Sequence, residues 1–296
     1  MSEMATDHPD NRPQRKQVEV PGGLLDLTLS PVVPGAPIVC AAHPAGVFAE
    51  SAVDLLREIT GASVVCINPR GIGQSSPVPS GDTRYTFDSM VDDLEVVRRH
   101  LGIHSWVFWG MSGGGWLGQA YGCRHPDALD GLILESICSC FRVRLADPAC
   151  ILSPFHAQCG PALELRGLID HQSHTAVGDA SATEWLEVNG VGSVFRRRNG
   201  PALLVSPTPV SAEMRTAMPL LWTADFRESL QAIRTPTLVI GGSADPIVPL
   251  AHVQSLQGGI GGSRLLVVDG GGHVPTTARH SQVIDATRSF LRDCAR

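Results

Sequence analysis

The chain reads Trp106-Val107-Phe108-Trp109-Gly110-Met111-Ser112-Gly113-Gly114 where an apolar run meets a glycine-rich turn. The apolar run is typical of a buried strand, and a helical pattern follows the turn to about Cys123. This is the G-x-S-x-G motif in a strand–turn–helix setting. Its glycines permit a turn too sharp for bulkier neighbours, and the turn lifts the serine hydroxyl to the N-terminus of a helix, where partial positive charge favours a developing anion. Ser112 is therefore a candidate nucleophile.

Two further polar residues follow strand-like runs in the order that this motif requires. A serine hydroxyl is a poor nucleophile near neutral pH and needs a base, which in turn needs an orienting acid. Asp245 comes directly after the apolar run Thr237–Ile240, and His273 comes directly after Arg264–Val268. Because the carboxyl ends of parallel strands meet at one edge of a sheet, the sequence predicts a catalytic triad of Ser112, Asp245 and His273.

Other acids and bases compete for these roles. Asp245 precedes Pro246, and Asp-Pro pairs also initiate turns without any chemistry. Glu135 and Asp269 are alternative acids because each also lies near a strand end, and Glu135 is the better substitute. His280 is a weaker base because it falls where the last helix should begin. The preferred acid is Asp245.

An acyl-transfer transition state also needs two N–H donors for its oxyanion. One predicted donor is the N–H of Gly113, the residue after the nucleophile. The other belongs to the loop after the apolar run Ile38–Ala41. Pro44 has no N–H, so Ala45 is the predicted second donor. His43 is expected to brace this loop rather than to act as a base.

Short apolar, β-rich runs alternate with helical patterns over most of the chain, which is typical of a parallel sheet with crossover helices. The later runs are apolar throughout, as in strands covered on both faces. The predicted strands are Val18–Val20, Leu24–Ser30, Ile38–Ala41, Ser63–Ile67, Trp106–Trp109, Leu132–Leu134, Thr237–Ile240 and Arg264–Val268. The expected fold class is α/β, with a mostly parallel central sheet and helices on both faces.

The clearest helix is predicted at Phe87–Leu101, with Thr86 as its N-cap and Gly102 just beyond its end. Its apolar residues fall at helical spacing, while Asp92 and Asp93 are expected to face away from the core. The last helix is predicted from about residue 281 to about residue 291.

About a hundred residues between Glu135 and Thr237 interrupt this alternation. A loop of that length inside a compact domain is normally a lid or an inserted subdomain. The predicted domains are a flexible, polar tail at residues 1–17, an α/β core at residues 18–136 and 237–296, and an inserted, mainly helical cap at residues 137–236.

Composition limits the classes of partner. The chain has 296 residues, 43% of them hydrophobic, which allows a sizeable core. A formal net charge of −6 and the absence of a long basic run argue against a nucleic-acid or anionic-membrane surface. The sequence shows neither a secretory signal nor an apolar stretch long enough to span a bilayer. We therefore expect a small-molecule substrate, and no nucleic-acid or membrane partner.

The eight cysteines form no C-x-x-C pair and have no histidines at zinc-ligand spacing. Cys40 and Cys66 fall inside apolar strand-like runs, where cysteine behaves as a small hydrophobic residue. This usage fits a reducing cytoplasm, and neither a metal nor an organic cofactor is expected.

Several of these segments together resemble the α/β-hydrolase superfamily from residue 18 onward. The markers are His43-Pro44-Ala45-Gly46, Asn68-Pro69-Arg70-Gly71-Ile72-Gly73-Gln74-Ser75, the turn at Ser112, Ser243-Ala244-Asp245-Pro246-Ile247-Val248-Pro249 and Gly272-His273. The family commonly has His-Gly where this chain has His43-Pro44. The resemblance implies that the inserted cap covers the site and selects the substrate, and the cap residues Trp185 and Trp222 are candidates for binding it.

The resemblance implies a carboxylesterase-like serine hydrolase that cleaves an ester, thioester or amide of a small-to-medium organic substrate through an acyl-enzyme. Within the superfamily, Tyr85–Gly102 and the segment from Ser112 through His125-Pro126 are similar to proline iminopeptidase-like members, so an aminopeptidase is the alternative. An alternative of another class is a non-catalytic, ligand-binding homologue of this fold. The substrate and the oligomeric state are left open.

Overall fold

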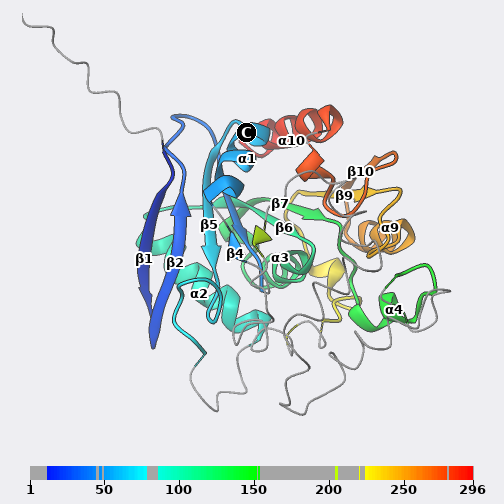
Figure 1. Cartoon of the computed structure of the whole chain (residues 1–296), viewed down its shortest axis with the longest axis horizontal. Coiled ribbons are helices and arrows are strands. Elements are labelled where there is room, and N and C mark those ends of the chain that lie inside the picture. Colours follow the sequence, from blue (N-terminus) through cyan, green and yellow to red (C-terminus); the bar gives the residue numbers. More distant parts are fainter. Residues whose placement is uncertain are drawn as a thin grey trace, which may run out of the picture.

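An eight-stranded sheet forms the centre of the part of the chain that the structure describes (Figure 1). The computed structural model describes residues 12–44, 47–48, 50–78, 86–151, 153, 204–205, 220, 224–278 and 280–295. The strands of this sheet are β1 (Gln14–Val20), β2 (Gly23–Leu29), β3 (Ile38–Ala42), β5 (Ser63–Asn68), β6 (Trp106–Met111), β7 (Leu129–Glu135), β9 (Thr237–Gly242) and β10 (Arg264–Val268).

The strand order is β1-β2-β5-β3-β6-β7-β9-β10. Strand β2 pairs antiparallel with β1 and with β5, and every other neighbouring pair is parallel. The predicted mostly parallel sheet is therefore confirmed. Strands β5, β6 and β9 are buried along their whole length, as the uninterrupted apolar runs indicated. Cys40 of β3 and Cys66 of β5 are buried as well.

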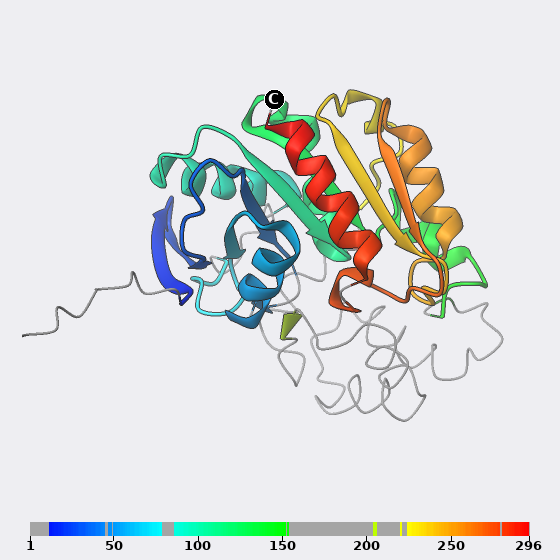
Figure 2. The same ribbon diagram turned by 90° about the horizontal axis from the view of Figure 1, so that it is seen from above.

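Helices cover both faces of the sheet, as predicted (Figure 2). Helices α1 (Glu50–Thr60) and α10 (Ser281–Cys294) pack together over one face, where they share a buried apolar cluster. Helices α2 (Phe87–His100), α3 (Gly113–Arg124) and α9 (Leu250–Gly259) contribute to a second cluster over the other face. The side chain of Arg288 joins the first pair, since its Nε donates to the carbonyl of Ile59 at 3.0 Å.

Helix α2 begins at the predicted residue and ends one residue before its predicted end. The hydroxyl of Thr86 accepts a hydrogen bond from the N–H of Ser89, which is an N-cap, and Gly102 just beyond the helix has φ +67°. Asp93 is the exception to its predicted pattern, because it is buried rather than turned to solvent. It accepts from Nε and Nη2 of Arg70 at 2.6 and 2.9 Å, so the partner in the loop after β5 explains its burial.

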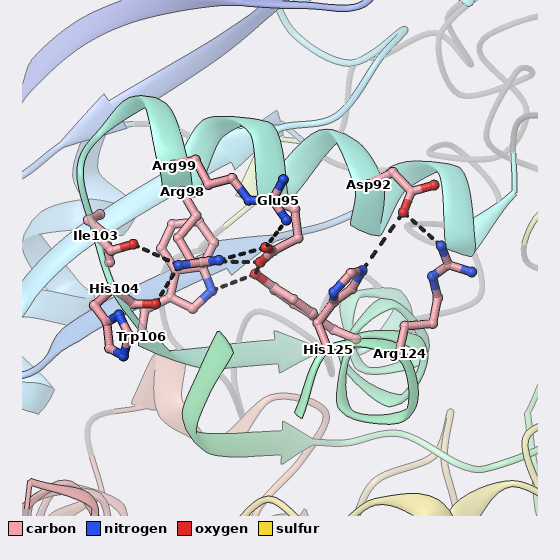
Figure 3. A network of polar contacts seen from close by, with 10 residues as sticks. Asp92, Glu95, Arg98, Arg99, Ile103, His104, Trp106, Arg124 and His125 are labelled. Carbon is pink, nitrogen blue, oxygen red and sulfur yellow. Dashed lines mark hydrogen bonds and ion pairs between the residues drawn. The ribbon is translucent and has the colours of Figure 1, made fainter. Parts of the chain in front are cut away.

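Glu95 on α2 is the acceptor of a buried network that reaches the strand leading to Ser112 (Figure 3). Its carboxylate accepts from Nε of Arg98 at 2.8 Å and from the hydroxyl of Tyr121 at 2.5 Å, and Trp106 Nε1 donates to that hydroxyl at 3.0 Å. Burial raises the pKa of Glu95, but the hydrogen bonds from Arg98 and Tyr121 outweigh burial and lower it to about 2. The network ties α2 to the start of β6 and to the last turns of α3, the ends of these two elements that lie away from Ser112.

The predicted N-terminal tail is too long by several residues. Strand β1 begins at Gln14, and residues 14–17, assigned to the tail from their polarity, pair with β2 in the register Gln14↔Leu29 to Gln17↔Asp26. Strand β1 lies at the edge of the sheet, where exposed polar side chains leave the backbone ladder intact. Residues 1–11 lie outside the described residues.

Most of the predicted cap also lies outside the described residues, and the cap stays a prediction. Described pieces of it are helix α4 (Phe141–Ala146) and β8 (Leu204–Val205), which pairs with β4 (Val47–Phe48) in a small antiparallel sheet. Among the described residues, no helix is long and apolar enough to cross a membrane.

Candidate active site

The nucleophile turn lies between the end of β6 and the start of α3. Ser112 occupies it with φ 48° and ψ −126°, a conformation that costs energy for a residue with a side chain. Two glycines make room for the turn: a Cβ on Gly110 would lie 2.4 Å from the carbonyl oxygen of Gly114, and a Cβ on Gly114 would lie 2.5 Å from that of Ala42. The motif therefore needs glycine at these two positions because backbone atoms of the neighbouring segments occupy the space that a Cβ would take.

The three residues of the predicted triad lie together at the carboxyl ends of β6, β9 and β10. His273 Nε2 is 2.9 Å from the hydroxyl oxygen of Ser112, and His273 Nδ1 is 2.8 Å from Oδ2 of Asp245. The side chains of His273 and Asp245 are only 4% and 1% exposed. A carboxylate only accepts hydrogen bonds, so Nδ1 carries the proton and Nε2 is left to accept from the serine hydroxyl.

The backbone of its own loop fixes the orientation of Asp245. Its other oxygen, Oδ1, accepts from the N–H of Ile247 at 2.8 Å and from that of Val248 at 3.0 Å. With one oxygen held in this way, Oδ2 is directed at the imidazole. The turn that Asp245-Pro246 initiates therefore serves the same geometry as the contact with His273.

The loop that carries His273 is anchored directly after the histidine by two side chains at the end of β7. The N–H of Val274 donates to Oγ of Ser136 at 3.0 Å, and the N–H of Thr276 donates to Oε1 of Glu135 at 2.8 Å. Ser136 and Val274 have φ of +52° and +57°, so like Ser112 they hold a backbone conformation that side chains disfavour. Strained backbone gathers at this edge of the sheet.

The predicted oxyanion donors are described only in part. The N–H of Gly113 belongs to the first residue of α3, where a helix offers no intrahelical acceptor, and it lies directly beside the serine. Ala45 lies outside the described residues. The neighbouring His43 is buried, and burial, reinforced by the charge of His273, lowers its pKa to about 3. His43 is therefore neutral near neutral pH, in keeping with a bracing role.

The rival acids and base occupy other positions. Glu135 is completely buried and accepts from Trp109 Nε1 at 3.0 Å as well as from Thr276, and burial raises its pKa. Asp269 accepts from the hydroxyl of Ser243 at 3.1 Å, and His280 precedes the first residue of α10. The hydrogen bond to His273 Nδ1 comes from Asp245 instead.

The sequence did not indicate that Ser136 and Thr276 take part in holding the histidine loop. Glu135 was considered only as an alternative acid of the triad. One signal was present: Glu135-Ser136 ends an otherwise apolar strand, where a charged residue is costly unless hydrogen bonds compensate it. The partners of these side chains are backbone N–H groups, which no residue pattern encodes.

The start of the predicted cap packs between the serine turn and the loop of Asp245. Ile137 packs against Gly115, since a Cβ added to Gly115 would lie 2.5 Å from Cγ2 of Ile137. Further along, the N–H of Ile151 donates to the carbonyl of Pro246 at 2.7 Å, and His252 Nε2 is 2.8 Å from Asp147 Oδ2. The substrate-binding candidates Trp185 and Trp222 lie outside the described residues. Within the described part of the chain, no group of three or more potential ligands could hold a metal ion.

Two family models match the chain. The model described as "alpha/beta hydrolase fold" matches residues 40–156, which include the serine turn. The model described as "TAP-like protein" matches residues 216–296, which include Asp245 and His273.

Among curated proteins, the chain is similar to proline iminopeptidases. It is 40% identical to that of Neisseria gonorrhoeae over 77 residues, which are 26% of this chain and only 24% of that protein. It is 23% identical to that of Lactobacillus helveticus over 251 residues, covering 81% of this chain and 83% of that protein. The more similar match thus spans about a quarter of the relative's length.

Among solved structures, the chain is similar to an alpha/beta fold family hydrolase from Bacillus anthracis. The TM-score is 0.74 at 18% sequence identity, and the alignment covers 96% of this chain and 99% of the other. A likeness at this level of identity shows the fold.

Proposed function

We propose that this member of the α/β-hydrolase superfamily is a serine hydrolase that cleaves an ester, thioester or amide of a small-to-medium organic substrate. The family and the fold agree with the resemblance inferred from the sequence. The observation that carries the proposal is the continuous relay from the hydroxyl of Ser112 through His273 to Asp245, with contacts of 2.9 and 2.8 Å. Two buried side chains in this order would convert a weak nucleophile into an effective one.

In the proposed reaction, Ser112 Oγ attacks the substrate carbonyl while His273 Nε2 takes the hydroxyl proton. Asp245 holds the imidazole in the required tautomer and stabilises the imidazolium that forms. His273 returns the proton to the leaving group, and the acyl-enzyme remains on Ser112. Water, deprotonated by the same histidine, then attacks the acyl carbonyl and releases the acid.

The tetrahedral intermediates place a negative charge on the former carbonyl oxygen. We assign its stabilisation to the N–H of Gly113 and, from the sequence, to the N–H of Ala45. The position of Gly113 at the start of α3 supports the first assignment, because the helix dipole adds to the hydrogen bond. None of these steps uses a metal or an organic cofactor.

A carboxylesterase-like activity is the first candidate, and a proline iminopeptidase-like activity is the second. The second is favoured by the 40% identity to the Neisseria gonorrhoeae enzyme, although that match covers 77 residues. Fold and triad do not select between an ester and an amide, since the same constellation serves both. The two candidates differ in the bond that is cleaved and in the acyl group that the site prefers.

The test is turnover of a panel by the wild type and by Ser112→Ala. The panel contains p-nitrophenyl esters of increasing chain length, an acyl thioester, and prolyl- and alanyl-naphthylamide. Cleavage of short esters alone, abolished in Ser112→Ala, supports the esterase, and preference for the prolyl amide supports the aminopeptidase. Turnover that persists undiminished in Ser112→Ala would contradict the proposed chemistry.

A further inference from the structure

Glu135 contacts both halves of the candidate active site, although it belongs to neither. Its backbone carbonyl accepts from the N–H of Ser112 at 2.9 Å, and this bond holds the nucleophile turn. Its side-chain Oε1 accepts from the N–H of Thr276 at 2.8 Å, three residues after His273. The end of β7 is therefore the point at which the serine turn and the histidine loop share one support.

The chemical nature of this support is unusual for its surroundings. Glu135 is 0% exposed, and its second oxygen, Oε2, accepts from the buried Trp109 Nε1 at 3.0 Å. A buried carboxylate is costly, and a neutral acceptor would satisfy the same two N–H donors at lower cost. The Oε1 bond to Thr276 places this carboxyl against the loop that carries His273. Burial raises the pKa of Glu135, whereas its hydrogen bonds and the positive charge of His273 lower it, so the imidazolium and a negative charge at Glu135 favour each other.

We infer that Glu135 is a positioning residue for His273, acting in two ways. Its hydrogen bond to Thr276 holds the histidine loop in register with Ser112, and its negative charge favours the imidazolium that forms when Ser112 attacks. The inference rests on the proposed hydrolase function and deepens it. Glu135 is not the acid of the triad, because the hydrogen bond to His273 Nδ1 is made by Asp245.

The titratable groups around the His273 imidazole come from three different elements. They are Asp245 from the loop after β9, His43 from the loop after β3 and Glu135 from β7. His43 is neutral over the pH range of an assay because its pKa is about 3. Removing the charge at Glu135 therefore leaves Asp245 as the one anionic group among these three.

The two effects can be separated in a Trp109→Phe background. Glu135→Gln alone would set an amide NH₂ against the Trp109 N–H, and that variant is at risk of misfolding. With Trp109→Phe the indole donor is gone, and Thr276 is the remaining described partner of the side chain at position 135. Three proteins are compared: Trp109→Phe, Trp109→Phe/Glu135→Gln and Trp109→Phe/Glu135→Met. The step from Glu to Gln removes charge and keeps an acceptor, and the step from Gln to Met removes the acceptor.

The measurement is the rate of inactivation by a fluorophosphonate as a function of probe concentration and pH, with thermal midpoints recorded by circular dichroism. The Met variant is expected to have a limiting inactivation rate roughly 10- to 100-fold below that of the Gln variant, with an unchanged half-saturating concentration. The Gln variant is expected to move the acid-limb midpoint of the pH profile about 0.5–1 unit lower than in Trp109→Phe, because the imidazolium loses an attractive charge.

Equal limiting rates in the folded Gln and Met variants would overturn the positioning role, whatever their thermal midpoints. An unmoved acid-limb midpoint between Glu and Gln would overturn the electrostatic role. A wild type that does not react with the probe, while remaining folded, would overturn the proposed function and this inference with it. The matched control is Glu95→Gln, a second buried carboxylate (Figure 3), which is expected to lower thermal stability without changing the limiting rate.

Discussion

Replacement of Asp245 by asparagine isolates the role of the acid, because the substitution preserves its size and most of its hydrogen bonds. Oδ1 of Asp245 accepts from the N–H groups of Ile247 and Val248, so the amide oxygen of an asparagine would occupy that position. The amide NH₂ would then face Nδ1 of His273. Because an NH₂ group only donates, Nδ1 would become the acceptor and the proton would move to Nε2.

A proton on Nε2 faces the hydroxyl of Ser112 across the 2.9 Å contact and prevents it from transferring its own proton. This is the wrong tautomer for a general base, and the corresponding substitution in other serine hydrolases lowers turnover by about 10⁴. We therefore expect Asp245→Asn to lower kcat about 10³- to 10⁴-fold, which corresponds to roughly 4–5.5 kcal/mol in the activation free energy. KM should stay within a few-fold, because Asp245 does not contact the substrate in the proposed mechanism.

The assay is steady-state hydrolysis of the best p-nitrophenyl ester or naphthylamide of the panel, with thermal unfolding as the check on folding. Asp269→Asn is the matched control, since Asp269 bonds the hydroxyl of Ser243 and is expected to leave kcat unchanged. Retention of more than a tenth of the wild-type kcat in folded Asp245→Asn would refute the reasoning. If Asp269→Asn removed the activity while Asp245→Asn retained it, the acid would have to be reassigned.

Three further predictions concern stability. Gly114→Ala should lower the free energy of unfolding by about 1–3 kcal/mol or more, because its Cβ would lie 2.5 Å from a β3 carbonyl oxygen. Gly258→Ala in α9, where a Cβ would meet nothing within 4 Å, should raise it by up to about 1 kcal/mol. Equal shifts of the thermal midpoint in the two variants would contradict this prediction. Arg70→Met should cost about 3–5 kcal/mol in chemical denaturation by leaving the carboxylate of Asp93 buried without its partner, and Arg70→Met/Asp93→Leu should recover most of that loss. The pKa of Glu95 is lowered from 4.5 to about 2 on folding, so its contribution to stability is present above pH 4.5 and is lost as pH falls toward 2. The thermal midpoint of Glu95→Gln should therefore depend less on pH between these values than that of the wild type. An equal pH dependence in the two proteins would contradict the assignment.

The sheet was predictable because buried parallel strands leave uninterrupted apolar runs. Arg264–Val268 has the predicted boundaries, and the helix predicted at Phe87–Leu101 ends one residue earlier, at His100. The predictions that were wrong share a cause: they concern residues whose partners lie elsewhere in the fold. The residues of β1 from Gln14 to Gln17 pair through their backbone, so their polar side chains carried no strand signal. Asp93 is buried by a partner far along the chain, which helical periodicity does not report.

The positions of the triad residues were predictable from residue type and order alone, because each follows a strand and the strands end at one edge. What the sequence did not reveal is how the loops are held. The supports of the histidine loop are Glu135 and Ser136, and each acts by accepting from a backbone N–H that any residue would offer. Backbone partners leave no trace in side-chain patterns, so such supports become visible only in three dimensions.

The central claim is that Ser112 is the nucleophile of a working relay. The most direct measurement is intact mass followed by peptide mapping after reaction with a fluorophosphonate, on the wild type and on Ser112→Ala. The account predicts a single stoichiometric adduct on the peptide that contains Ser112, and no adduct in folded Ser112→Ala. Folded wild-type protein that acquires no adduct, or acquires it at another residue, would contradict the account and favour a ligand-binding homologue without catalytic activity.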